Sequence, residues 1–367
     1  MLKILFLMVM QTVKLIHDQV SCIFCLQKLC YNEVYFSRGD KLKKFLILIL
    51  LLALAFIFPF KFLTLPDEWT LEAKDSAREF IKKQTDKKQI EVKSVDIGNI
   101  KLNMTNEEVD RLLGKPVRTL NNQFNDKWSL YHQSYKHFVM IGYLDDKVAA
   151  LYSNDPNYIG NISVEELKKD KGEPLTVEEG KNYRAHLSEE NILNYEDADV
   201  RSTYYYDQHD KRIDALMIVS ERYFNQKKHY YAASTETLAR SYEQVDYELI
   251  NASRVKRGLP VLQYHDKISK TALQHSQNMA DNHFFDHTNP QGETPFDRMT
   301  SDGNQYKRAG ENLAAGQVSP IEAHHGLMNS EGHRANILMT SYKSVGIGVA
   351  FNEKQVPYYT ENYITEK

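Results

Sequence analysis

The sequence predicts an α+β protein in which two folded domains follow a membrane-spanning segment. The first observation is a continuous apolar run over residues 45–58. The second is a helix and β-hairpin pattern that occurs twice within residues 93–222. The third is a C-terminal part with strong helical periodicity that ends in two strand-like runs. A chain of 367 residues is long enough for two domains and a tail.

The composition is that of an ordinary globular protein. It is 42% hydrophobic and 26% charged, which excludes a wholly disordered or collagen-like chain. The formal net charge of −3 supplies no basic field for nucleic acid, so nucleic acid is not expected as a partner. All three cysteines (Cys22, Cys25 and Cys30) precede the apolar run. The main body therefore has no disulfide framework and depends on its hydrophobic cores.

The apolar run predicts a transmembrane signal anchor over residues 41–66. If Pro59 and Lys61 are tolerated near the far interface, the run reaches the ~20 residues that cross ~30 Å of hydrocarbon. Basic residues precede it and acidic residues follow it, which predicts that the C-terminal body lies outside the cytoplasm. A cleaved signal peptide that releases a secreted protein is the alternative. No A-x-A-like site follows the run, which favours an uncleaved anchor.

Two further segments flank the anchor. Residues 1–40 are interpreted as a cytoplasmic segment or as the product of a misassigned translation start, because the chain from Lys41 onward already resembles a complete export signal. Residues 67–92 are polar and charged with scattered apolar positions. They predict a juxtamembrane helix that acts as a spacer.

Residues 93–222 contain the same pattern twice. Each copy opens with a capping box, Thr105 with Glu108 and Ser163 with Glu166. A G-x-P sequence then ends each helix, because the glycine stops it and the proline prevents its continuation. Strand-like hairpins follow, over 138–143 and 148–152 in the first copy and over 203–206 and 213–219 in the second. The pattern predicts one α+β domain of two similar halves. It contains no clustered nucleophile, base or metal ligands, so we expect a structural role in preference to a binding role.

This region resembles the CAP-associated N-terminal domain that precedes CAP domains in Gram-positive bacterial proteins. The resemblance rests on the S/T-x-x-E helix starts, the G-x-P stops, Trp128 with Tyr131, and the D-K-V sequence at residues 146–148.

The last part of the chain is interpreted as a linker over residues 223–242 and a second domain over residues 243–367. Apolar periodicity, Ser319 before Pro320, and Gly and Pro stops predict helices, and two apolar runs predict strands. The expected helices cover residues 247–258, 266–280 and 320–329, and the expected strands cover 345–351 and 358–364. This order fits three-layer αβα packing. His324 and His325 are predicted to lie on a solvated or half-buried helix face.

The second domain also carries a series of motifs in a fixed order. They are NASR at 251–254, RGLPVL at 257–262, HSQNMA at 275–280, FDHT at 285–288, GENLA at 310–314, SEGHRANIL at 330–338, VGIGV at 345–349 and YTE at 359–361. The series resembles bacterial CAP domains, of the superfamily of cysteine-rich secretory, antigen 5 and pathogenesis-related proteins. The resemblance implies an αβα sandwich with a cleft lined by two histidines and two acidic residues.

Three corners of that cleft are assigned by the resemblance. His287 matches the first histidine, Glu311 the first acid and His333 the second histidine. The fourth corner stays open between two residues. The family pattern has Trp where this chain has Leu327, and the acid three residues later falls on Ser330, with Glu331 one residue further on.

The four candidate residues suggest two kinds of chemistry. The neutral imidazoles of His287 and His333 can bind a divalent cation, zinc in the first place, with Glu311 as supporting partner or general base. Yet two histidines are fewer than the three protein ligands usual in catalytic zinc sites, and the chain lacks H-E-x-x-H. A purely structural role, with Glu311 and His333 holding the loops, is the alternative.

The sequence therefore predicts a membrane-anchored extracytoplasmic binding module. Its expected partners are the membrane, through the N-terminal helix, and an envelope lipid, glycan, peptide or protein in the cleft. The alternative is a metal-assisted, protease-like hydrolase that acts at the cell envelope. Whether the protein is an enzyme stays open at this point.

Overall fold

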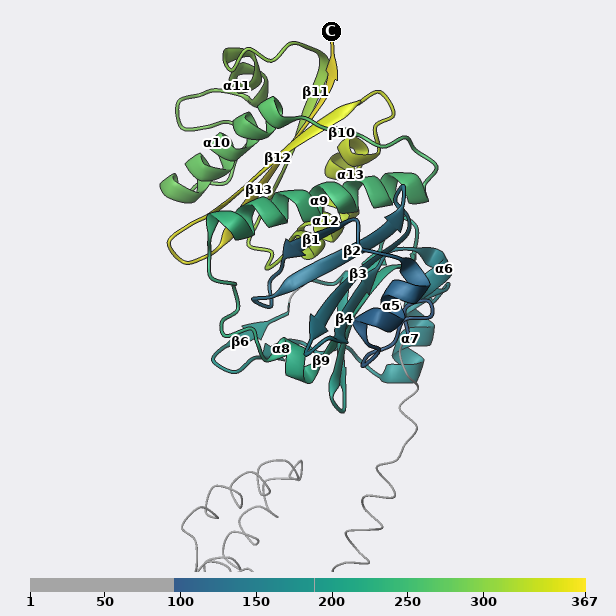
Figure 1. Ribbon diagram of the computed structural model, residues 1–367. Helices are drawn as coiled ribbons and strands as arrows, with labels where there is room; N and C mark the ends of the chain where they lie inside the picture. The colour runs from purple at the N-terminus through teal and green to yellow at the C-terminus, as the bar shows by residue number, and fades with distance from the viewer. Residues whose placement is uncertain (1–95, 188) are drawn as a thin grey trace, which may run out of the picture. The chain divides into compact units, whose positions relative to one another are not determined.

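The computed structural model describes residues 96–187 and 189–367 (Figure 1). The predicted N-terminal segment, anchor and spacer, residues 1–40, 41–66 and 67–92, lie outside the described residues. All described residues belong to one compact unit, residues 93–367. Within this part of the chain, none of the helices combines the length and the apolar character that a bilayer crossing requires.

The first half of this unit is an antiparallel sheet of seven strands in the order β1-β2-β3-β4-β9-β8-β7. Its strands are β1 (Arg118–Asn121), β2 (Lys127–Gln133), β3 (Lys136–Leu144), β4 (Lys147–Ser153), β7 (Ile192–Asp197), β8 (Val200–Asp207) and β9 (Arg212–Ser220). Helices α5 (Asn106–Leu113), α6 (Pro156–Ile159), α7 (Val164–Lys171) and α8 (Glu221–Phe224) and the small hairpin β5 (Val177–Glu179) with β6 (Arg184–His186) complete it. The strands β4 and β9 meet at the centre, where Ala150 pairs with Val219.

The predicted local signals of this half are confirmed. Thr105 caps α5 by accepting a hydrogen bond from the Glu108 amide at 3.2 Å, while the Glu108 carboxylate accepts from the Thr105 amide at 2.7 Å. Ser163 and Glu166 form the equivalent box on α7. The turn of the β3–β4 hairpin has φ values of 51° and 61° at Asp145 and Asp146, as a type I′ turn requires.

The seven-stranded sheet is buried on both faces at its centre. Apolar side chains of α5 and α7 pack with Ile141, Leu151 and Ile218 on one face. The other face packs against helices of the second half through Val245 and Ile321, among others. This double burial explains why β3, β4 and β9 are apolar runs rather than alternating strands.

The second half of the unit is a four-stranded sheet, in the order β10-β12-β13-β11, between helices. The strands are β10 (Gln263–Tyr264), β11 (Tyr306–Ala315), β12 (Ser344–Phe351) and β13 (Pro357–Glu366). The helices are α9 (Glu236–Lys256), α10 (Asp266–Asn282), α11 (Pro295–Ser301), α12 (Pro320–Asn329) and α13 (Glu331–Leu338). Figure 1 shows α9 and α10 on opposite sides of this sheet. The predicted helices at 266–280 and 320–329 and both predicted strands are confirmed.

The end of the predicted linker 223–242, residues 236–242, is instead the start of helix α9. Thr235 caps the helix by accepting a hydrogen bond from the Leu238 amide at 3.0 Å. Leu238 and Tyr242 then bury their side chains in the second core, so these residues pack as an element rather than as a connection. The other domain boundaries stay predictions.

Gly348 permits the close packing of β12 on α10. A Cβ at this position would meet the backbone of Ala272 and Leu273. We expect Gly348→Ala to lower the free energy of unfolding by about 3 kcal/mol, because the helix backbone would have to move. Gly326→Ala is the matched control. It lies in α12, where an added Cβ would meet open space, and should raise stability by up to about 1 kcal/mol. Urea unfolding of both variants measures the difference, and equal stabilities would contradict this packing.

Candidate functional site

The predicted acid Glu311 lies on the edge strand β11 with both carboxylate oxygens engaged. Its side chain is 2% exposed. Oε1 lies 2.9 Å from Nδ1 of His287, and Oε2 accepts a hydrogen bond of 2.8 Å from Nη2 of Arg298. A buried carboxylate needs such partners, because its desolvation is otherwise uncompensated. Glu311 therefore holds two other side chains in place, and each of its oxygens already has a partner in the protein.

Arg298 was not predicted as a site residue. It lies on the short helix α11, which begins at a capping box formed by Thr294 and Asp297. Its Nη1 donates to the carbonyl oxygens of His287 at 2.8 Å and Glu293 at 2.9 Å. One guanidinium thus binds the Glu311 carboxylate and the loop that carries His287. The T-P-x-D pattern at 294–297 signals the helix, but no local pattern signals the ion pair.

Nδ1 of His287 is held by Glu311, whereas its Nε2 makes no hydrogen bond within the described residues. Its side chain is 49% exposed, although its partner Glu311 is buried. An ionised carboxylate can only accept, so Nδ1 carries the proton and Nε2 holds the lone pair of the neutral ring. The hydrogen bond to Glu311 raises the pKa of His287 above its ordinary value, against the opposing effect of partial burial.

His333 lies on α13 close enough to His287 for the two rings to repel each other when charged. Burial, and then the charge of His287, lowers the pKa of His333, so its imidazole is neutral at pH 7. Its backbone carbonyl accepts a hydrogen bond of 3.1 Å from the side chain of Asn312. Asn336 of α13 also donates to Asn312, at 2.9 Å. These amide contacts fix α13 against β11 beside Glu311.

The fourth corner of the cleft is not joined to the other three. Glu331 is exposed, and within the described residues it makes no hydrogen bond or ion pair with His287, Glu311 or His333. Ser330 connects α12 to α13 and makes no side-chain capping bond. The assignment of either residue to the cleft stays a prediction.

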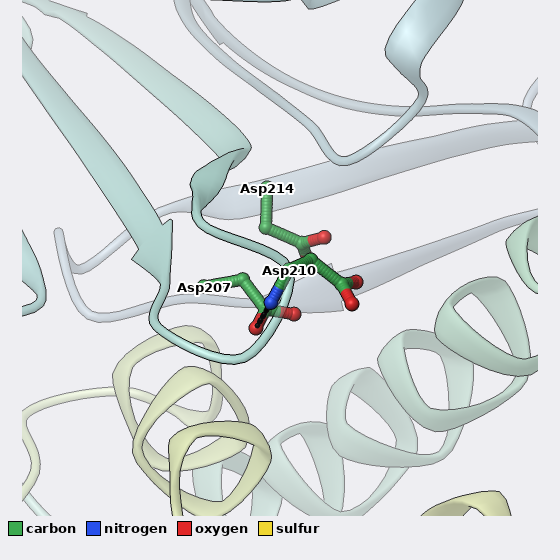
Figure 2. Close-up of side chains that lie close together, drawn as sticks. All are labelled: Asp207, Asp210 and Asp214. Carbon is green, nitrogen blue, oxygen red and sulfur yellow. Dashed lines mark hydrogen bonds between the residues drawn. The ribbon is translucent and has the colours of Figure 1, made fainter. Parts of the chain in front are cut away.

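Metal-ligand geometry occurs elsewhere in the described part of the chain. The ligand atoms of Asp207, Asp210 and Asp214 lie within 4.8 Å of one another. Figure 2 shows these three side chains close together at the turn. Within the described part of the chain, such a group is not formed by the predicted residues His287, Glu311, Glu331 and His333. The three aspartates, however, already have cationic partners in the protein.

These partners identify the aspartates as an ion-pair cluster. Nη2 of Arg257 lies 2.8, 3.0 and 3.2 Å from oxygens of Asp207, Asp210 and Asp214, respectively. Lys256 pairs with Asp214 at 2.8 Å. Burial opposes ionisation of Asp214, but the two cations hold its pKa well below the usual range. Arg334 and Arg212 are the third and fourth cations of the cluster, so the three carboxylates leave no net negative charge to attract a metal.

Arg334 connects this cluster to the candidate site. It follows His333 on α13 and pairs with Asp207 at 2.8 Å and with Asp210 at 3.2 Å. One turn earlier, Asn329 accepts a hydrogen bond of 2.8 Å from the Gln208 amide. The β8–β9 turn of the first half therefore holds the α12–α13 corner that carries His333.

The prediction for His324 and His325 is wrong. Both side chains are fully buried. Nε2 of His324 lies 2.7 Å from the Ser253 hydroxyl, and Nε2 of His325 lies 2.9 Å from the Tyr152 hydroxyl. Burial lowers the pKa of His325 to about 3. The seven-stranded sheet covers α12, a contact that the helical periodicity of α12 alone does not reveal.

Two family profiles match the chain. Residues 247–363 match the CAP family, described as the cysteine-rich secretory protein family. Residues 102–230 match the family described as CAP-associated N-terminal.

Two relatives come from Bacillus subtilis (strain 168). The chain is 29% identical to "Uncharacterized membrane protein YlbC" over 283 residues, which are 70% of this chain and 80% of the relative. It is 48% identical to "Uncharacterized protein YkwD" over 108 residues, 29% of this chain and 42% of that protein. The chain thus spans less than half of the second relative.

Solved structures agree on the fold. An extracellular protein containing a SCP domain from Bacillus anthracis str. Ames superposes with a TM-score of 0.62 and 25% identity, over 72% of this chain and 94% of the other. A cysteine-rich secretory protein from Staphylococcus aureus gives a TM-score of 0.58 with 14% identity over the same shares, which shows the fold alone.

The effect of Glu311 on His287 can be measured by titrating His287. In Glu311→Gln the imidazolium of His287 loses its anionic acceptor, so we expect the pKa of His287 to fall, as followed by its ring carbon-bound protons in NMR. Because the native pKa is raised, this pair stabilises the fold fully below the unfolded value of about 6.5, and the contribution is lost as pH rises through the folded pKa. Glu331→Gln should leave the titration unchanged. An unaltered His287 pKa in Glu311→Gln would refute the assignment.

The ion pairs of Asp207 with Arg257 and Arg334 hold the α12–α13 corner, so Asp207→Asn should destabilise the protein. This change weakens the pairing of two largely buried arginines, so we expect a loss of about 2 kcal/mol in stability and faster amide exchange in α13. Asp145→Asn is the control. It removes a solvent-exposed pair with Arg222, whose contribution should stay within about 0.5 kcal/mol. Equally small losses of stability in both variants would contradict a role of Asp207 in holding this corner.

Proposed function

Because the chain belongs to the proteins that join a CAP-associated N-terminal domain to a CAP domain, we propose that it is a membrane-anchored binding module outside the cytoplasm. The site is the cleft around His287, Glu311 and His333. Its ligand is a component of the cell envelope, namely a lipid, glycan, peptide or protein.

The membrane anchor is supported by the sequence and by one relative. Residues 45–58 are apolar, with basic residues before them and acidic residues after them. YlbC, which matches over most of both chains, is named a membrane protein. The Bacillus anthracis structure is of a protein described as extracellular. The single-pass topology places the CAP domain on the outer side, and release after signal cleavage is the alternative.

The internal repeat belongs to the same proposal. Capping-box helices α5 and α7 each precede strands of one half of the seven-stranded sheet. The order β1-β2-β3-β4-β9-β8-β7 puts the last strand of each half at the centre. This arrangement supports a duplicated module that serves as a structural platform for the CAP domain.

The observation that carries the binding function is the half-exposed His287 ring held by a buried carboxylate. Its free Nε2 is oriented before any ligand arrives, which lowers the entropic cost of binding. His333 supplies a neutral imidazole nearby. Above the pKa of His287, both rings present nitrogen acceptors at a partly exposed surface.

A divalent cation, zinc in the first place, fits this donor set only in part. His287 and His333 would be its ligands, and Glu311 would support His287 through Nδ1. Two nitrogens are fewer than the usual three, and the oxygens of Glu311 are engaged, so the binding should be weak unless the envelope ligand completes the site. When bound, such an ion supplies Lewis acidity.

In the hydrolase alternative, this geometry favours His287 over Glu311 as the general base. Glu311 is a positioning group, so His287 would take the proton of an attacking water, oriented by Glu311 as in other histidine–carboxylate pairs. Ser276 is not available as a nucleophile. Its buried hydroxyl donates to the Gly348 carbonyl at 2.8 Å.

Zinc titration by calorimetry separates these possibilities. We expect the full chain in mild detergent to bind zinc weakly, with a Kd above about 1 μM, and His287→Ala/His333→Ala to lose the heat. The control is His265→Ala, which removes a histidine that pairs with Glu366 near the end of β13. Equal heats for the double variant and the unchanged protein would eliminate the metal site and leave metal-free binding to be tested with envelope fractions.

A further inference from the structure

A cavity that is partly open to solvent lies away from the candidate histidine site. It is a cavity of about 230 Å³ where both halves of the compact unit meet. One wall comes from β5, β6 and β7, and another comes from the turn after β11 and the start of α12. Tyr230 and Tyr231, from the segment between α8 and α9, complete it. None of His287, Glu311 and His333 lines this cavity.

Glu322 lines the cavity, and within the described residues one of its carboxylate oxygens accepts no hydrogen bond. The residue lies in the first turn of α12, where its amide donates to the Ser319 hydroxyl at 3.3 Å. Oε2 accepts from the Val318 amide at 3.3 Å, whereas Oε1 accepts no hydrogen bond within the described residues. Lys227, the nearby cation, is paired with Glu178 at 3.0 Å. The capping role of Glu322 therefore uses one oxygen and leaves the other.

The unpaired oxygen of Glu322 sets the chemistry of a ligand. An acceptor without a donor destabilises a protein unless water or a ligand supplies one. Because Glu322 is a carboxylate, a ligand group that donates hydrogen bonds and carries a positive charge satisfies it best.

The aromatic side of the cavity already accommodates an ammonium group. Nζ of Lys227 lies 4.9 Å from the ring centroid of Tyr230 and 5.0 Å from that of Tyr183. Ring faces attract cations electrostatically, and the attraction strengthens as water is excluded. The hydroxyl of Tyr231 donates to the Gly316 carbonyl at 3.0 Å, which fixes this side chain on the cavity wall.

We propose that this cavity binds a small molecule through a primary ammonium group. The ammonium donates to Oε1 of Glu322, and the remainder of the molecule lies along Tyr230 and Tyr231. An anion would face Glu322 and Glu178 together and would leave the Glu322 oxygen without a donor. The volume has room for fewer than about ten non-hydrogen atoms, given ~30 Å³ per water in the liquid. This ligand is separate from the one proposed for the histidine cleft.

Pentylamine and 1-pentanol are the matched probes, since they differ in charge at one end. Calorimetry uses the full chain in mild detergent near pH 8.5, because burial raises the pKa of Glu322 to about 7 and the amine keeps its proton. We expect pentylamine to bind at least about tenfold more tightly than 1-pentanol. Equal affinities, or no binding of the amine up to its solubility limit, would overturn the proposal.

Glu322→Gln tests the residue, since it keeps the shape and the capping acceptor but removes the charge. Pentylamine affinity should fall at least about tenfold, with folding checked by circular dichroism. Glu353→Gln, which alters an exposed carboxylate at the β12–β13 turn, should bind as the unchanged protein does. If Glu322→Gln does not fold, Tyr230→Leu takes its place and should weaken the amine more than the alcohol. Unchanged amine binding in the folded variant would contradict the assignment.

Discussion

The candidate site depends on the buried charge of Glu311. A carboxylate that is 2% exposed must have both oxygens satisfied, and Arg298 and His287 do this from two different segments. Arg298 also binds the backbone of His287, so a single ionic network fixes both the loop and its ring. On the other side, Asn312 joins the adjacent β11 position to α13. The result is a half-exposed imidazole whose orientation is set by the protein, which is what a recognition site requires.

Helix α9 makes the two halves one body. Its residues Val245 and Leu249 belong to the core beneath the seven-stranded sheet, whereas Tyr242 and Ile250 belong to the core of the CAP domain. The aspartate cluster in the β8–β9 turn adds an electrostatic contact through Arg257 and Arg334. The CAP-associated half therefore contributes to the position of the corner that carries His333, beyond serving as a spacer from the membrane.

Local chemistry made much of this architecture predictable. Capping boxes, type I′ turns and apolar runs depend on neighbours in sequence, so α5, α7 and the β3–β4 hairpin followed from them. Strand β11 was missed because its Gly, Glu and Asn residues are poor strand formers that serve the site instead. The family resemblance proposed His287 and Glu311 as candidates, and the structure brings the two together. The contacts of Arg298 and the burial of His325 arise instead between distant segments. No periodicity within one element encodes such contacts.

The central claim is that Glu311 holds His287 with the proton on Nδ1 and the lone pair on Nε2. Long-range nitrogen–proton NMR on protein with ¹⁵N-labelled histidine, above the pKa of His287, reads the tautomer from the two ring nitrogen shifts. The account predicts a protonated Nδ1 and an unprotonated Nε2 for His287, and loss of this preference in Glu311→Gln. A His287 ring that is predominantly protonated at Nε2 in the unchanged protein would contradict it.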